Sequence, residues 1–102
     1  MTEKSSNVPI LAPVMVIVAQ GTSKTISFPD EYMGEAVSLL ISNLDATNVA
    51  TYQIGGPAMP TLTLSTSSFR SFDDTKIRLI TVTAGAAGAV QVQAQVQSLL
   101  RN

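Results

Sequence analysis

Residues 90–97 are Val90-Gln91-Val92-Gln93-Ala94-Gln95-Val96-Gln97, an unbroken alternation of apolar side chains and glutamines. Successive side chains of a β-strand point to opposite faces of the sheet, so a period of two residues is typical of a strand with one buried face. The glutamines form an uncharged, hydrogen-bonding row on the other face. This stretch predicts a β-strand whose valines and alanine point into a core.

The same period recurs upstream of this strand. Further strands are predicted at residues 14–18, 25–28, 37–43, 49–54, 61–64 and 76–82, separated by turn-forming Gly, Pro, Asn, Asp and Ser. Residues 69–72 are predicted as a short strand or a turn. The strand at 14–18 is apolar on both faces, which is typical of a strand covered on both sides. Residues 29–34 are predicted as an acidic loop and Asp73-Asp74 as a turn. In 37–43 the residues predicted to face inward are Val37, Leu39 and Ile41, with a short helix over 35–40 as the alternative.

These strands predict an all-β fold. No segment of helical length keeps a 3.6-residue period, and parallel strands need crossovers of about a dozen residues or more. The expectation is a single antiparallel β-sandwich of about eight short strands, in a jelly-roll or related Greek-key order. We expect residues 1–13, which contain Pro9 and Pro13, to form an extended N-terminal arm, and residues 14–102 to form the sandwich.

The composition excludes several classes of function. The chain has no His, Cys or Trp and a net charge of −1. It therefore lacks thiol and histidine nucleophiles and the usual zinc and haem ligands, and it has no basic surface for nucleic acid. We expect no enzyme activity, no cofactor, no metal and no small-molecule substrate. The start of the chain does not resemble a signal peptide, and no stretch of the sequence is long and apolar enough for a membrane-spanning helix.

Charged residues make up only 13% of the chain, whereas well-behaved monomer surfaces carry about 25–35%. A surface with so few charges indicates that copies or partners cover it. The chain is accordingly expected to form a homo-oligomer, a trimer or pentamer. The candidate subunit contacts are the apolar residues of the arm and the amide row: Val8, Ile10, Leu11, Gln91, Gln93, Gln95 and Gln97.

Three features together suggest a family: the proline-containing arm before Pro13, the strand–turn–strand of residues 40–54, and the strand 76–82 followed by a small-residue turn and the glutamine strand. In these features the chain resembles small structural proteins of bacteriophage virions, namely capsid decoration, cement and minor capsid or vertex proteins. The resemblance implies a non-enzymatic structural protein of a virus particle. It also implies contacts with other capsid proteins, and synthesis in the host cytoplasm without a signal peptide.

The alternative is a carbohydrate- or cell-surface-binding β-sandwich module. Sugars are bound by aromatic platforms with amide and carboxylate partners, and the candidates here are Tyr32, Tyr52, Asp45, Asn48 and the glutamine strand. Aromatic residues make up only 5% of the chain, which weighs against this reading.

Overall fold

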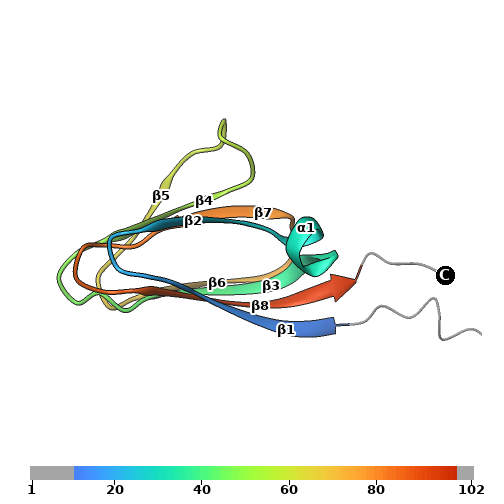
Figure 1. Cartoon of the computed structure of the whole chain (residues 1–102), viewed down its shortest axis with the longest axis horizontal. Helices are drawn as coiled ribbons and strands as arrows, with labels where there is room; N and C mark the ends of the chain where they lie inside the picture. The colour runs from blue at the N-terminus through green and yellow to red at the C-terminus, as the bar shows by residue number, and fades with distance from the viewer. Residues whose placement is uncertain (1–10, 99–102) are drawn as a thin grey trace, which may run out of the picture.

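The computed structural model describes residues 11–98, which form two four-stranded sheets and one short helix at one end of them (Figure 1). The elements are β1 (Leu11–Val18), β2 (Ser23–Ser27), α1 (Phe28–Tyr32), β3 (Gly34–Asn43), β4 (Ala50–Ile54), β5 (Leu62–Leu64), β6 (Phe69–Ile77), β7 (Leu79–Thr83) and β8 (Val90–Ser98). Sheet A has the order β1-β8-β3-β6 and sheet B the order β2-β7-β4-β5. All neighbouring strands are antiparallel, and the order is that of a jelly roll. The predicted β-sandwich is confirmed.

The core lies between the two sheets and follows the alternation of the sequence. The predicted inward side chains of β8, Val90, Val92, Ala94 and Val96, are all buried. Ile26, Ile80 and Ile54 form a row across β2, β7 and β4 of the opposite sheet. Phe28 and Tyr52 are the two largest fully buried side chains. Because both sheets present short β-branched residues to each other, they can pack closely over this core.

The first strand begins earlier than expected. β1 starts at Leu11, so residues 11–13, predicted as part of the arm, belong to sheet A. The rest of the predicted arm, including Val8 and Ile10, lies outside the described residues. β1 is an edge strand, and this position tolerates Pro13, since a proline has no N–H to donate to a neighbouring strand.

Residues 28–32 form the helix α1 where an acidic loop was predicted, and this expectation is corrected. Pro29 lies in the first turn, where a backbone N–H would have no acceptor within the helix, so its absence breaks no hydrogen bond. The negative charges of Asp30 and Glu31 stabilise the N-terminus of the helix. Both carboxylates also accept hydrogen bonds from Ser27, from its hydroxyl to Asp30 (2.9 Å) and from its N–H to Glu31 (3.1 Å). The helix connects sheet B to sheet A at one end of the sandwich (Figure 1).

The predicted turn at Asp73-Asp74 is wrong, because β6 runs through both residues to Ile77. Asp74 has a φ of 55°, and residues 74–76 lie opposite the single residue Val37 of β3. This bulge allows pairing to continue on both sides of it. The Thr75 hydroxyl donates to the carbonyl of Ala36 across the bulge (3.0 Å). At the bulge, the buried residue of β3 is therefore Ala36, whereas Val37, predicted to face inward, is only half-buried.

Candidate functional site

The outward side chains of sheet A form rows that cross three or four of its strands. Their register follows from the strand pairing. The rows are Ile17–Gln91–Ser42–Phe69, Met15–Gln93–Leu40–Ser71, Pro13–Gln95–Ser38–Asp73 and Leu11–Gln97–Glu35. We call this surface the outer face of sheet A. It combines an apolar stripe along β1 with amides and hydroxyls along β8 and β3.

Large apolar side chains on this face are open to solvent. The exposed fraction is 57% for Leu11, 61% for Met15, 53% for Ile17 and 67% for Phe69. The strand at 14–18 was predicted to be covered on both sides, and this is wrong for the single chain, since only its inner side packs on the core. Continuous exposed apolar surface of this kind marks sites of interaction. Within residues 11–98, the outer side of β1 is left exposed.

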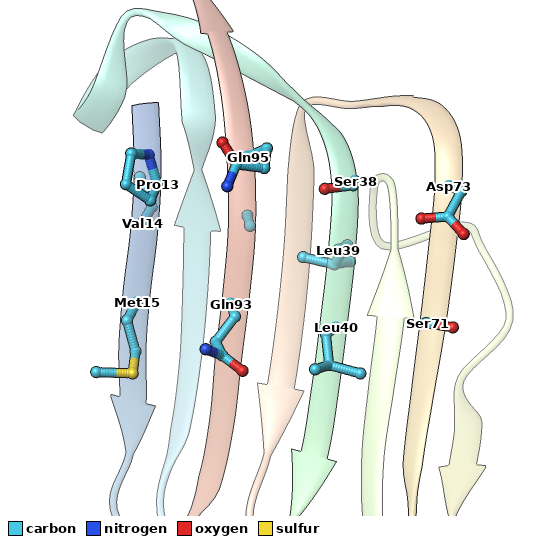
Figure 2. Close-up of a pocket in the computed structure, with 11 residues that line it drawn as sticks. Pro13, Val14, Met15, Ser38, Leu39, Leu40, Ser71, Asp73, Gln93 and Gln95 are labelled. Carbon is cyan, nitrogen blue, oxygen red and sulfur yellow. The ribbon is translucent and has the colours of Figure 1, made fainter. Parts of the chain in front are cut away.

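The centre of this face is a shallow hollow of about 440 Å³ (Figure 2). Met15, Gln93 and Leu40 lie side by side across β1, β8 and β3 in one row of its lining (Figure 2). Pro13, Gln95, Ser38 and Asp73 form the next row. The Gln91 side-chain amide also donates to the Sδ of Met15 (3.0 Å), which joins the amide row to the apolar stripe. In the hollow, the glutamines of β8 therefore lie between Pro13 and Met15 of β1 on one side and Ser38 and Leu40 of β3 on the other, with the Asp73 carboxylate also in the lining.

Charges are sparse on both broad faces of the described chain. Among the paired outward positions of sheet A, the charged residues are Asp73, on the edge strand β6, and Glu35, at the end of the face. Arg78 lies 3.9 Å from the Glu35 carboxylate. The paired outward positions of sheet B are Ser23, Ser27, Thr25, Thr51, Gln53, Thr63, Leu79, Thr81 and Thr83, with no charge among them. The scarcity of charge in the composition is thus a property of the two broad surfaces.

The structure brings the predicted contacts of the described chain together. Leu11 and the four glutamines lie on adjacent strands of one face, with Leu11 opposite Gln97. Sequence reasoning missed the other apolar members, Pro13, Met15, Ile17, Leu40 and Phe69. A proline in a strand points to an edge position, and this signal, combined with the apolar outer side of 14–18, was available in the sequence.

A second polar cluster lies at the end of the sandwich opposite α1, where the loops between strands meet. Asp45 is 1% exposed, and its carboxylate accepts hydrogen bonds from the N–H groups of Thr47 (2.8 Å), Asn48 (2.9 Å) and Ala87 (3.0 Å) and from the Asn48 amide (3.2 Å). The buried Asn43 side chain donates to the carbonyls of Asn48, Leu64 and Ser65. The predicted turn chemistry of Asp45-Asn48 is confirmed. The side chains of Asn43 and Asp45 join three loops, so this cluster has a structural role.

This cluster bears on the carbohydrate-binding alternative. Two of its candidate contacts, Tyr52 and Asp45, are buried, Tyr52 with only 2% of its surface exposed. Tyr52 packs edge-on against Phe72, with ring centroids 6.1 Å apart, and so belongs to the core. Neither side chain presents a platform or an acceptor to a sugar.

The Asp45 carboxyl is held in its ionised form. Burial alone raises the pKa of this carboxyl, but the hydrogen bonds from Asn48, Thr47 and Ala87 outweigh burial and lower the pKa from 3.8 to about 2. A carboxyl with a lower pKa in the folded chain contributes stability above its unfolded pKa, and this contribution is lost as the pH falls through its folded pKa. We therefore expect the urea midpoint of unfolding to fall between about pH 4 and pH 2. The Asp45→Asn variant should lack this part of the loss, and equal losses in both proteins would contradict the assignment.

Gly88 provides a further test of the cluster. A Cβ at this position would lie 2.5 Å from the Cα and 2.8 Å from the N of Asp45, so main chain would have to move. Gly88→Ala is expected to lower the free energy of unfolding by about 1–3 kcal/mol, the usual cost of overpacking. Gly56→Ala is the control, because a Cβ at Gly56 meets nothing within 4 Å. Chemical denaturation of both variants checks this, and equal stability would show that the loop of residues 84–89 does not pack as described.

Residues 11–98 contain no group of three or more His, Cys, Asp or Glu side chains placed to hold a metal ion. None of their helices is long and apolar enough to cross a membrane.

Comparison with known proteins gives similarity at the level of structure. No protein-family model matches the chain, and no curated protein matches it by sequence. A chain of the Bacillus endospore appendages, described as a novel family of disulfide-linked pili, is similar with a TM-score of 0.54 and 17% identity, over 96% of this chain and 97% of that chain. A cupin domain of an XRE-family transcriptional regulator from Enterobacter cloacae has a TM-score of 0.43 and 13% identity, over 91% and 98% of the two chains. At these identities the similarity of the appendage chain concerns the fold alone.

Proposed function

We propose that this chain is a non-enzymatic structural subunit whose copies assemble through the outer face of sheet A. The observation that carries the proposal is the open apolar stripe of β1 beside an uncharged amide row. Covering the exposed part of Leu11, Met15, Ile17 and Phe69 contributes about 1 kcal/mol for each side chain. The amides and hydroxyls between them supply hydrogen bonds to a partner without the cost of burying charge.

The setting that we propose is a virus particle, with the chain as a capsid decoration, cement or minor capsid protein made in the host cytoplasm. A small subunit repeated around a symmetric shell gains avidity from many equivalent contacts, so modest individual contacts suffice. Trimers or pentamers that also contact other capsid proteins would place the β1 stripe at a subunit boundary. The N-terminal residues Val8 and Ile10, which precede this stripe, are proposed as additional contacts.

A surface fibre is the second candidate setting, favoured by one specific observation. The appendage chain with the similar fold belongs to a family described as disulfide-linked pili. This chain contains no cysteine, so its copies cannot be joined by disulfides. A fibre of this chain would be held by non-covalent contacts, and a reducing agent would leave it intact.

Negative-stain electron microscopy of concentrated protein, with and without dithiothreitol, tests the proposal and separates its two settings. We expect particles larger than one chain that are unchanged by the reductant. Closed rings, or binding to capsid shells, support the virion setting, whereas filaments support the fibre. A glycan array with strong hits, together with protein that stays monomeric on the grid, would instead favour the carbohydrate-binding module.

A further inference from the structure

The loop between β4 and β5, residues 55–61, projects from sheet B on the side away from sheet A (Figure 1). Its tip, Pro57-Ala58-Met59-Pro60, is exposed and carries no charge. The Gln53 side-chain amide donates to the carbonyls of Pro57 (3.2 Å) and Met59 (2.6 Å), and the Met59 N–H donates to Gly56 (3.0 Å). The loop is therefore a fixed apolar projection. A preformed projection loses little conformational entropy when it binds.

The hollow on the outer face of sheet A matches this projection in chemistry. The apolar side chains of Met15 and Leu40 suit proline, alanine and methionine side chains. Gln93 and Gln95, which lie between β1 and β3, suit the backbone carbonyls and N–H groups of a loop. Neither surface carries a charge that the other would leave unpaired, except Asp73 at the margin of the hollow. The hollow and the loop belong to opposite sheets, so one chain cannot fill its own hollow.

The area of the outer face is sufficient for a contact between copies. Four strands spaced about 4.8 Å apart and four outward residues spaced about 6.8 Å apart cover about 500 Å². Counting both partners, a copy that covers this face would bury about 1,000 Å², the lower limit for a specific interface. This is a sufficient area when the same contact repeats in an assembly.

We infer that the β4–β5 loop of one copy occupies the hollow of the next copy, an inference that rests on the proposed self-assembly. The contact joins two different surfaces, so each copy both donates a loop and accepts one. Such head-to-tail contacts close into rings when the rotation permits and extend into filaments when it does not. One interface thus accounts for either a trimer or pentamer or a fibre.

Disulfide trapping tests this inference directly, because the chain has no cysteine of its own. Ala58→Cys at the loop tip and Gln93→Cys in the hollow are introduced in separate full-length chains, one of them with an affinity tag. The two chains are mixed under mild oxidation. We expect the mixed disulfide to form at least about ten-fold faster than with the control pair Ala58→Cys and Asp30→Cys, because binding raises the effective concentration of the thiols. Asp30 is exposed on α1, away from both surfaces.

Other outcomes overturn the inference. A rate equal to that of the control pair would show that the loop does not enter the hollow. Faster homodimers of the Gln93→Cys chain would show two outer faces of sheet A packed on each other. Faster trapping of Gln93→Cys by Asn7→Cys would assign the hollow to the N-terminal segment. Light scattering of the unmodified chain distinguishes failure of the loop contact from failure of self-assembly. Oligomers without fast Ala58–Gln93 disulfide formation would contradict the loop contact only, and a monomer would contradict both proposals.

Discussion

Replacing Met15 by aspartate is expected to weaken the association of copies by about 30-fold or more, the loss typical of a buried interface residue at the centre of a contact. Met15 lies on the apolar stripe of β1, in the lining of the hollow, and the Gln91 amide donates to its Sδ. A carboxylate at this position would be buried by a partner without a cation to pair with, which costs more than the lost apolar contact. Sedimentation velocity over a range of concentrations measures the change.

The control for this variant is Met33→Asp, the same substitution at a methionine with a similar exposed fraction, 55% against 61% for Met15. Met33 follows α1 at the end of the sandwich, away from the outer face of sheet A. It should associate like the unmodified chain. If both variants associate equally well, or both lose association equally, the outer face of sheet A is not the contact.

Asp45→Ala is expected to have the largest effect on folding, lowering the melting temperature by about 10 °C or more, the size expected when hydrogen bonds to a buried charge are removed from a small domain. The substitution leaves the N–H groups of Thr47, Asn48 and Ala87 without their acceptor. It also removes the side-chain hydrogen bond that joins the loop of residues 84–89 to the β3–β4 loop. Thermal unfolding followed by circular dichroism measures the change.

Two comparisons make this result specific. Asp45→Asn keeps one acceptor oxygen for Thr47 and Asn48 and should lose less stability than Asp45→Ala. Asp73→Ala removes an exposed carboxylate from the edge strand β6 and should leave the melting temperature almost unchanged. An Asp45→Ala protein as stable as Asp73→Ala would contradict the structural role of the cluster.

The alternation of the sequence predicted most of the fold. The strict period in β8 placed Val90, Val92, Ala94 and Val96 in the core, and all four are buried. The strand predicted over 37–43 is confirmed against its helical alternative, because the serine positions keep to the outer face of β3. Alternation predicts a strand well where one face is buried and the other is exposed to solvent, because the residue types then alternate between apolar and polar.

Other features depend on contacts that a local pattern does not contain. Asp73-Asp74 resembles a turn, but pairing with β3 keeps both residues within β6 as a bulge. Asn43 ends a predicted strand and Asp45 begins a predicted turn, and no local pattern shows that the closure of three loops around them buries both. Polar residues are buried where their partners are supplied by distant segments, and a single sequence does not show those partners.

The candidate surface was only partly predictable for a related reason. The amide row was visible in the sequence, because alternation itself separates the two sides of β8. The apolar half of the surface was missed, because the apolar residues of 14–18 on both sides suggested complete burial. β1 lies at an edge of the sheet with Met15 and Ile17 exposed, and this exposure is the basis of the proposed assembly.

The mass of the full-length chain in solution tests the central claim most directly. Sedimentation equilibrium from low to high micromolar concentration, in buffer with and without dithiothreitol, gives that mass without any label. The account predicts a mass that rises with concentration to a multiple of 10.7 kDa and is the same in both buffers. A mass of 10.7 kDa at every concentration would contradict it.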